Sequence, residues 1–417
     1  MKSKKILVWF RNDLRLHDNE MLVEAIAKSD SILPVYFFDP RYAEATADGG
    51  TKTGMIRSKF LIESVAALRE ALIKIGGNLL VISGKPEDHI PALVEQYEIA
   101  EVYHHREVAT EETTISSHVE DLLWKLRINL KHFIGHTLYN KEDLPFPIKD
   151  IPNVFSQFKK KTERDANVKD CFLSPVQINH VTVEDWGELP LSPAGPAGPV
   201  GGEKEGIKHL KQIFEDGAEI YSKSNAKIHG EKGAFCSVLS PWLAVGCLSP
   251  RKVYWAVKTA ERKFGNNPNF SHLILGLLWR DYFRFMFKKH TVSFFSEVVT
   301  EMNDSLTEGE YQKQLAQWKE GRTGHVLVDQ YMKELNATGF IPHAGRLLVA
   351  TFFIYVIKLN WLDGAYYFEQ KLIDYSPASN WGNWANVAIG AKDPRSKNTF
   401  DLDKQIKMLD LEIFVPS

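Results

Sequence analysis

Short apolar runs alternate with helical patterns over the first third of the chain. The runs are ILVWF (Ile6–Phe10), LPVYFF (Leu33–Phe38), LLVI (Leu79–Ile82) and VYHH (Val102–His105). They are rich in β-branched and aromatic residues, which favour strands. Between them, Gly54–Ile75 and Glu87–Tyr97 have helical patterns, the first with apolar residues at helical spacing. We therefore expect an α/β, Rossmann-like domain with a parallel sheet over residues 1–135.

The pattern changes twice further along the chain. Gly135–Trp186 contains several prolines and has weak periodicity, and Gly187–Gly206 is rich in proline and glycine. Such a stretch holds neither a helix nor a strand, so we expect a connection and linker over residues 136–206. From Ile207 onward helical patterns dominate, among them Pro250–Phe264, His272–Lys289, Gly309–Lys319, Val326–Leu335 and Gly345–Lys358. These predict an all-helical domain over residues 207–417.

The composition is that of an ordinary globular protein. Of 417 residues, 44% are hydrophobic and 25% are charged, and the length predicts two or more domains. A net charge of −2 and a pI near 6.7 do not indicate a general polyanion binder. The longest apolar run, Leu347–Ile357, is too short to cross a bilayer, and MKSKK does not lead into a signal-length apolar region. We expect no membrane association.

Cysteine and histidine positions argue against a metal site. Cys171, Cys236 and Cys247 lack metal-ligand spacing, and their odd number argues against a disulfide framework. A reducing cytoplasm is therefore expected. His104 and His105 end a strand pattern without visible metal partners. The chain also lacks G-x-S-x-G, H-E-x-x-H and P-loop motifs, which argues against hydrolytic and nucleophilic chemistry.

The loop after the first predicted strand, FRNDLRLHDNE, carries several charged side chains. Ligands of parallel sheets bind beyond the carboxyl ends of the strands, where this loop lies. Two interpretations are open: a ligand or interdomain site, or a solvated loop with its own ion pairs. The local pattern slightly favours the solvated loop.

Charged and hydroxyl side chains interrupt the apolar stretches of the helical part. Ser237 and Ser240 precede a helix start, where serines bind an anion or, more often, cap the helix. Arg280 and Asp281 lie within LILGLLWRDYFRFMF, and Arg346 opens the most apolar helix. A buried charge there needs a partner or a ligand. Asp374 is a plausible partner for Arg346.

The segment Asp374–Trp384, DYSPASNWGNW, collects unusual side chains. It contains Trp381 and Trp384, with Trp361 and Trp318 upstream. A buried indole also requires a partner for its N–H. Two interpretations are open: an aromatic core cluster, or redox-active rings that lead from the surface to a buried aromatic cofactor.

Taken together, these motifs resemble the photolyase/cryptochrome family, most closely its cryptochrome DASH branch. The resemblance covers nearly the whole chain and rests on LVWFRNDLRLHDNE, PVYFFDPR, HREVATEE, TLYNKEDLPF, SPWLAVGCLSPRKVY, WRDYFRF, GRTGHVLVDQYMKELNATGF and DYSPASNWGNW. It implies an N-terminal α/β antenna domain and a C-terminal helical domain that holds FAD in a U-shape. It also implies blue-light excitation of the flavin followed by electron transfer.

The resemblance assigns roles to individual residues. Ser237 and Ser240 would contact the FAD phosphates, Arg346 and Asp374 would pair beside the isoalloxazine, and Asn380 would face flavin N5. Trp384 and Trp361 match the proximal and middle electron-transfer tryptophans. The surface member falls at Glu308, where Tyr311 or Trp318 are the candidate replacements. The remaining FAD-site residues are Tyr221, Cys236, Leu239, Arg280, Asp281, His343 and Ser376. Glu107 and Gln157 are candidates for a folate (methenyltetrahydrofolate) antenna.

The chain departs from the family in the lesion pocket. Gly276 stands in place of a glutamate, His343 and Ala344 replace an Asn-Arg pair, Ser376 replaces an acidic residue and Asn386 replaces an aromatic one. Trp279 remains as a stacking platform for a flipped pyrimidine dimer. Each lost partner costs roughly 1–3 kcal/mol if buried groups go unpaired. Weakened dimer binding is therefore expected.

Three hypotheses follow. The first is a FAD-binding, cryptochrome DASH-like protein with light-driven flavin chemistry and weakened dimer repair. The second is a photolyase, a light-driven carbon–carbon lyase, that acts on pyrimidine dimers in single-stranded DNA with a rebuilt pocket. The third is a light-insensitive flavoprotein or nucleic-acid-binding module that retains the fold. A monomer is expected, and the basic run Phe158–Arg164 is expected to be a solvated surface rather than a DNA contact.

Overall fold

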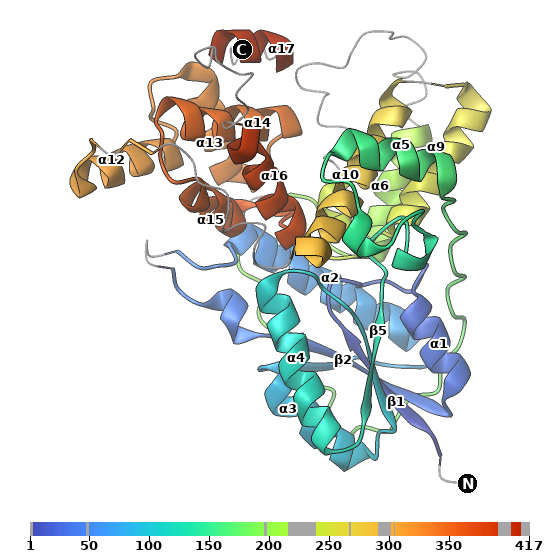
Figure 1. The fold of residues 1–417 in the computed structure, drawn as a ribbon. Coiled ribbons are helices and arrows are strands. Elements are labelled where there is room, and N and C mark those ends of the chain that lie inside the picture. Colours follow the sequence, from blue (N-terminus) through green and yellow to red (C-terminus); the bar gives the residue numbers. More distant parts are fainter. Residues whose placement is uncertain are drawn as a thin grey trace.

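A five-stranded parallel sheet forms the N-terminal part of the computed structural model (Figure 1). The structure describes residues 3–46, 50–195, 198–215, 239–266, 268–290, 302–303, 305–390 and 402–409. The strands are β1 (Lys5–Phe10), β2 (Ser31–Phe38), β3 (Leu80–Ser83), β4 (Glu101–His105) and β5 (Asn129–Phe133), in the order β3-β2-β1-β4-β5. The order reverses between β1 and β4, so the loops after these two strands flank the position where such sheets bind ligands.

Both faces of the sheet are covered by helices. The helices of this part are α1 (Glu20–Lys28), α2 (Met55–Lys74), α3 (Pro86–Tyr97) and α4 (Thr110–Lys125). Alternate residues of β1 point to opposite faces: Val8 packs in the core with α1 and α2, and Trp9 packs in the core with α3 and α4. Burial of both faces explains why the strands read as continuous apolar runs.

A long connection leads from β5 to the helical part. It contains the 3₁₀ turns η2 (Lys141–Asp143) and η3 (Ile148–Asp150) and the helix α5 (Phe155–Asp165). The helices beyond it are α6 (Glu203–Glu215), α8 (Ser240–Ala244), α9 (Pro250–Phe264), α10 (Pro268–His290), α12 (Glu308–Lys319), α13 (Val326–Thr338), α14 (His343–Thr351), α15 (Trp361–Lys371), α16 (Pro377–Gly390) and α17 (Leu402–Leu409). A short π-helix, η5 (Phe352–Val356), extends α14.

One hydrophobic core runs from the sheet into the helical part. Phe10 of β1 and Phe60 of α2 belong to the same buried cluster as Trp242 of α8 and Leu278 and Phe285 of α10. A second cluster joins α12 to α16 and includes Trp318, Trp361 and Trp384. Figure 1 shows α2 between the sheet and the C-terminal helices. The two parts are therefore bound to one another by apolar packing, in addition to the polar contacts described below.

The sequence patterns located most of these elements. The α/β class with a parallel sheet and the helical C-terminal part are confirmed. β5 was not predicted, because its sequence NLKHF places polar residues at three of five positions of an edge strand. The connection also holds a helix, α5, that its weak periodicity did not indicate.

Candidate functional site

The loop after β1 joins the sheet to the helical part. Arg15 is fully buried, and its guanidinium donates to the carbonyl oxygens of His17 (3.1 Å), Asp18 (3.1 Å), Gly135 (2.8 Å) and Gly246 (2.8 Å). Gly246 precedes α9 and has φ +71°, and a Cβ at this position would lie 1.8 Å from the Asn12 carbonyl oxygen. The expectation of a solvated loop was wrong, since residues 13–19 of this loop are buried and bond to the segment between α8 and α9.

Two ion pairs add to this contact between the loop and the rest of the chain. Asp18 accepts from the Arg251 guanidinium at 2.6 and 3.0 Å, and both side chains are buried. His17 Nδ1 lies 2.5 Å from Glu203 Oε1, and the backbone N–H of Leu16 donates to the same carboxylate. We call Arg15, His17, Asp18, Glu203 and Arg251 the interdomain clamp. Charged side chains in the motif thus fix the orientation of the helices relative to the sheet.

An ion pair lies at the start of α14 and the end of α15. Arg346 Nη2 donates to Asp374 Oδ2 at 2.7 Å, and Arg346 Nε donates to the Ile341 carbonyl. The Ser240 hydroxyl donates to the same Asp374 oxygen. The other oxygen, Asp374 Oδ1, is buried without a hydrogen-bond partner in the described structure. A buried carboxylate oxygen in this state fits a ligand N–H donor, as the uracil-like edge of a flavin provides.

Arg280 supplies a second unpaired group. Its Nη2 donates to the Leu243 carbonyl at 3.0 Å, whereas Nη1 is buried without a partner among the described residues. Burial lowers the pKa of Arg280 to about 10. An unused donor beside α8 fits an anionic or carbonyl group of a bound cofactor. The residues present therefore fit a flavin dinucleotide.

Asp281 faces away from this side of α10. Its carboxylate accepts from the backbone N–H groups of Leu138 (2.9 and 3.1 Å) and Tyr139 (3.3 Å). Burial raises the pKa of Asp281 to about 7. The contact ties α10 to the connection that follows β5, so this residue positions the helix that carries Trp279 and Arg280.

Helix α16 carries the buried amide and indole of the predicted site. Asn380 Nδ2 donates to the Ala365 carbonyl of α15 at 3.0 Å, which fixes the side chain and leaves its oxygen available as an acceptor. Trp384 and Trp361 are each 2% exposed. The Trp384 ring packs against Gly364 of α15, where a Cβ would lie 2.3 Å from it. Close packing of α15 on α16 therefore places both tryptophans in one cluster.

The two candidate replacements at the surface end differ in environment. Trp318 contacts Trp384 with ring centroids 6.2 Å apart, but it is fully buried. The Tyr311 hydroxyl donates to Asp363 and accepts from the Asn360 N–H. Glu308 begins α12 and is exposed. Trp381 lies beside Trp361 at 6.1 Å, a contact that the family pattern did not indicate.

The lesion-pocket positions lie on α10, α14 and α16. Gly276 of α10 has open space around its missing Cβ, His343 and Ala344 begin α14, and Asn386 of α16 is exposed. Ser376 is half-buried, and its carbonyl oxygen accepts from the Asn380 N–H. α10 and α16 pack closely enough that a Cβ on Gly382 would lie 2.3 Å from Phe283. The predicted pocket residues are thus on adjacent helices.

Trp279 is stacked by a residue that sequence reasoning missed. Phe155, the first residue of α5, lies parallel to the indole with ring centroids 3.6 Å apart and an interplanar angle of 10°. Tyr282 contacts both rings edge-on. One face of the Trp279 ring is therefore covered by the chain itself. No sequence signal indicated this contact, because the pattern did not show that Phe155 begins a helix.

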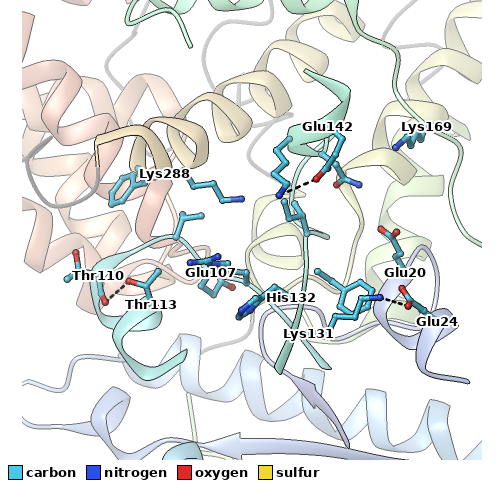
Figure 2. A pocket seen from close by; sticks show the side chains of 17 residues that line it. Glu20, Glu24, Glu107, Thr110, Thr113, Lys131, His132, Glu142, Lys169 and Lys288 are labelled. Atoms are coloured by element: carbon cyan, nitrogen blue, oxygen red, sulfur yellow. Dashed lines mark hydrogen bonds and ion pairs between the residues drawn. The ribbon is translucent and has the colours of Figure 1, made fainter. Parts of the chain in front are cut away.

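A cavity of about 830 Å³ lies at the carboxyl ends of β4 and β5, next to the end of α10. Figure 2 shows Glu107, His132 and Lys131 on the sheet side and Lys288 on α10. Burial lowers the pKa of Lys288 to about 8. Glu107 is buried and bonded to Arg284 (3.0 Å) and Asn12 (3.0 Å). Glu107 thus lines the cavity, whereas Gln157 is exposed on α5 and is not among its lining residues.

Some predicted site residues are not described by the structure. Tyr221, Cys236 and Ser237 lie outside the described residues, while Leu239 is buried directly before Ser240. In the described ranges, His, Cys, Asp and Glu side chains form no group of three or more that could hold a metal ion. The described helices include none that is long and apolar enough to span a membrane.

Two family models match the chain. The model described as "DNA photolyase" matches residues 6–177, and the model described as "FAD binding domain of DNA photolyase" matches residues 273–414. The first covers the sheet and its connection. The second covers α10 to α17, which include the Arg346–Asp374 pair and Trp384.

Similarity to known proteins extends over nearly the whole chain. Cryptochrome DASH of Gloeobacter violaceus is 39% identical over 98% of this chain and 84% of its own length. Cryptochrome DASH of Synechocystis sp. is 38% identical over 97% of this chain and 85% of its own length. A crystal structure of the Synechocystis cryptochrome superposes with a TM-score of 0.87 at 37% identity, and covers 98% of this chain and 87% of that one. A crystal structure of a class III photolyase from Agrobacterium tumefaciens shares the fold, with a TM-score of 0.77 at 24% identity. The match covers 98% of this chain and 85% of that one.

Proposed function

The chain belongs to the photolyase/cryptochrome family, and we propose that it is a FAD-dependent, cryptochrome DASH-like photoreceptor with weak dimer repair. The buried Arg346–Asp374 pair carries the proposal, because Asp374 Oδ1 has no partner within the described structure while Arg346 bonds to the other oxygen of the same carboxylate. When bound, FAD supplies blue-light absorption and one-electron chemistry. The remaining roles belong to side chains of this chain.

We assign each side chain one task. Asp374 would accept a hydrogen bond from the bound cofactor, and Arg280 and Ser240 would contact its polar groups. Asn380, fixed by its bond to Ala365, offers its amide oxygen near flavin N5. Trp384 would donate an electron to the bound cofactor, and Trp361 would return one to Trp384. Their burial excludes water from the oxidised indoles.

The open space at Gly276 and the covered ring of Trp279 support weak repair. A flipped base needs a stacking face and hydrogen-bond partners. Here Phe155 occupies one face of Trp279, and the polar residues typical of the family are missing at Gly276, Ala344 and Ser376. The second candidate, a photolyase for dimers in single-stranded DNA, is favoured by the retained Trp279 alone.

The cavity beside Glu107 is our proposed antenna site for a folate. Its size suits a ligand of this class, and Lys288, Lys131 and Arg106 offer positive charge to a carboxylate. Glu107 would have to share its carboxylate between Arg284 and the ligand.

Further proposals concern the organisation of the protein. We divide the chain into an antenna domain at 1–135, a connection at 136–206 and a FAD-binding domain at 207–417. The free thiols of Cys171 and Cys247 support a reducing compartment, which we take to be the cytoplasm. We propose a monomer without a metal.

Absorption spectroscopy of the purified protein tests the proposal. We expect a flavin spectrum that blue light bleaches in the wild-type protein. Trp384→Phe should retain the flavin but bleach far more slowly, while Trp124→Phe, which removes an exposed indole on α4, should behave as wild type. A colourless protein, or a bound flavin whose absorption does not change under blue light, would contradict the proposal. The second result would favour the light-insensitive alternative.

A further inference from the structure

We infer that Trp381 and Tyr366 form the surface end of the electron-transfer route in this protein. The inference rests on the proposed function, since it extends the path beyond Trp361. It is carried by two ring contacts that lead from a buried indole to an exposed phenol.

The three rings form a continuous series across α15 and α16. The centroids of Trp361 and Trp381 are 6.1 Å apart at 77°, and those of Trp381 and Tyr366 are 4.8 Å apart at 82°. Trp361 is 2% exposed, Trp381 is half-buried and Tyr366 is 56% exposed. An oxidised site therefore moves outward at each contact, from apolar surroundings towards water. Charge is better solvated at the outer positions, which favours movement in that direction.

Helix packing holds the middle ring in place. Trp361 and Tyr366 both belong to α15, and Trp381 of α16 lies between them. The Trp381 Nε1–H donates to the Tyr375 hydroxyl at 3.2 Å. Arg57 of α2 lies over the Tyr375 ring at 4.6 Å. The indole thus keeps one orientation, with its N–H satisfied and its ring against both neighbours.

Other positions are weaker candidates for the surface end. Glu308 is a carboxylate and cannot act as an aromatic electron donor. Trp318 contacts Trp384 but is fully buried, so its oxidised ring would remain inside the protein and away from solvent. Tyr311 is the strongest competitor, because its hydroxyl donates to Asp363, which can accept the proton on oxidation. Tyr366 combines greater exposure with a ring contact to Trp381, which itself contacts Trp361.

The steps balance in electrons and protons. With FAD bound and excited by light, Trp384 would give up one electron. Electrons would then pass from Trp361 to Trp384, from Trp381 to Trp361 and from Tyr366 to Trp381. Tyr366 loses its phenolic proton to water as it is oxidised, which leaves a neutral phenoxyl. A small thiol or ascorbate in solution then returns one electron and one proton to Tyr366.

Time-resolved electron paramagnetic resonance of the FAD-loaded protein after a blue flash tests the inference. In wild type we expect a tyrosyl signal after the tryptophanyl signal. Trp381→Phe and Tyr366→Phe should lose the tyrosyl signal, while flavin content and circular dichroism stay unchanged. Tyr366→Trp should retain a surface radical and convert it to a tryptophanyl one. Tyr254→Phe, a half-buried tyrosine on α9, is the matched control.

The outcomes separate this inference from the proposed function. If the tyrosyl signal survives in Trp381→Phe and Tyr366→Phe but disappears in Tyr311→Phe, the exit is at Tyr311 and the inference is wrong. A wild-type signal that stays tryptophanyl also overturns it, although the proposed function stands. If blue light produces no radical in the wild-type protein, both fail.

Discussion

At the scale of single residues, the site is marked by buried charged atoms that lack partners among the described residues. Asp374 Oδ1 and Arg280 Nη1 belong to DYSPASNWGNW and WRDYFRF, two of the motifs on which the predicted flavin site rests. Leaving such groups unpaired is costly in a folded protein, so they indicate a ligand. By contrast, the charges of the interdomain clamp are satisfied by protein atoms, which indicates a structural role.

Replacement of Arg346 by alanine tests the ion pair. Asp374 would remain buried with only Ser240 as a partner, and the free energy of unfolding should fall by about 2–3 kcal/mol. Flavin content should fall as well. Arg322→Ala removes an exposed pair with Glu320 and should cost less than about 0.5 kcal/mol. Urea unfolding measures both, and equal losses would contradict a buried, cofactor-holding pair.

Some residue roles could be predicted from the sequence and others could not. Arg346 and Asp374 were recoverable because charges in apolar stretches require partners. The stacking of Phe155 on Trp279 could not be predicted, because it depends on how α5 packs on α10, which lies far away in the sequence. Tyr366 is unremarkable in sequence, and only the packing of α15 on α16 brings it to Trp381.

At the scale of elements, the contact between α15 and α16 requires a glycine. Gly364→Ala would place a methyl group 2.3 Å from the Trp384 ring, so overpacking should cost about 1–3 kcal/mol and displace the indole. Gly276→Ala on α10 meets open space and should stabilise its helix by about 0.5–1 kcal/mol. Thermal unfolding with tryptophan fluorescence distinguishes the two, and a neutral Gly364→Ala would contradict the packing described.

The attachment of α10 to the connection should depend on pH. The folded-state pKa of Asp281, about 7, lies above its ordinary value of 3.8, so the folded protein binds the extra proton between these values. Stability from this group is full at low pH and is lost as the pH rises through about 7, with a slope of at most about 1.4 kcal/mol per pH unit. Asp281→Asn should remove this slope. Parallel stability curves for both proteins between pH 4 and 7.5 would contradict the assignment.

At the scale of the whole molecule, the sheet and the helices form one packed unit. The alternating pattern predicted the sheet, and helical periodicity predicted α9 with its observed bounds, Pro250–Phe264. The clamp was misjudged because charged residues usually indicate a solvated loop, whereas here Arg15 bonds to backbone carbonyl oxygens from both parts. Such long-range pairing is set by tertiary packing, which a local pattern does not contain.

The two sides of the proposed flavin site also differ at the scale of the whole molecule. The side formed by α14, α15 and α16 carries the ion pair, the amide and the tryptophans to which the proposed function assigns light-driven electron transfer. On the side proposed to receive a pyrimidine dimer, Gly276 has no side chain and open space around it, and Phe155 covers one face of the Trp279 ring. This difference supports the proposal that the protein performs photochemistry with its cofactor rather than dimer repair.

One measurement tests this central claim most directly. The purified, FAD-loaded protein is irradiated with blue light together with single-stranded and double-stranded oligonucleotides that carry a cyclobutane pyrimidine dimer, and the absorption spectrum and the remaining dimers are recorded from the same sample. We expect the flavin to be reduced by light while most dimers remain on both substrates. Loss of the dimers from the single-stranded oligonucleotide at a rate typical of photolyases, or a flavin unchanged by light, would contradict the account.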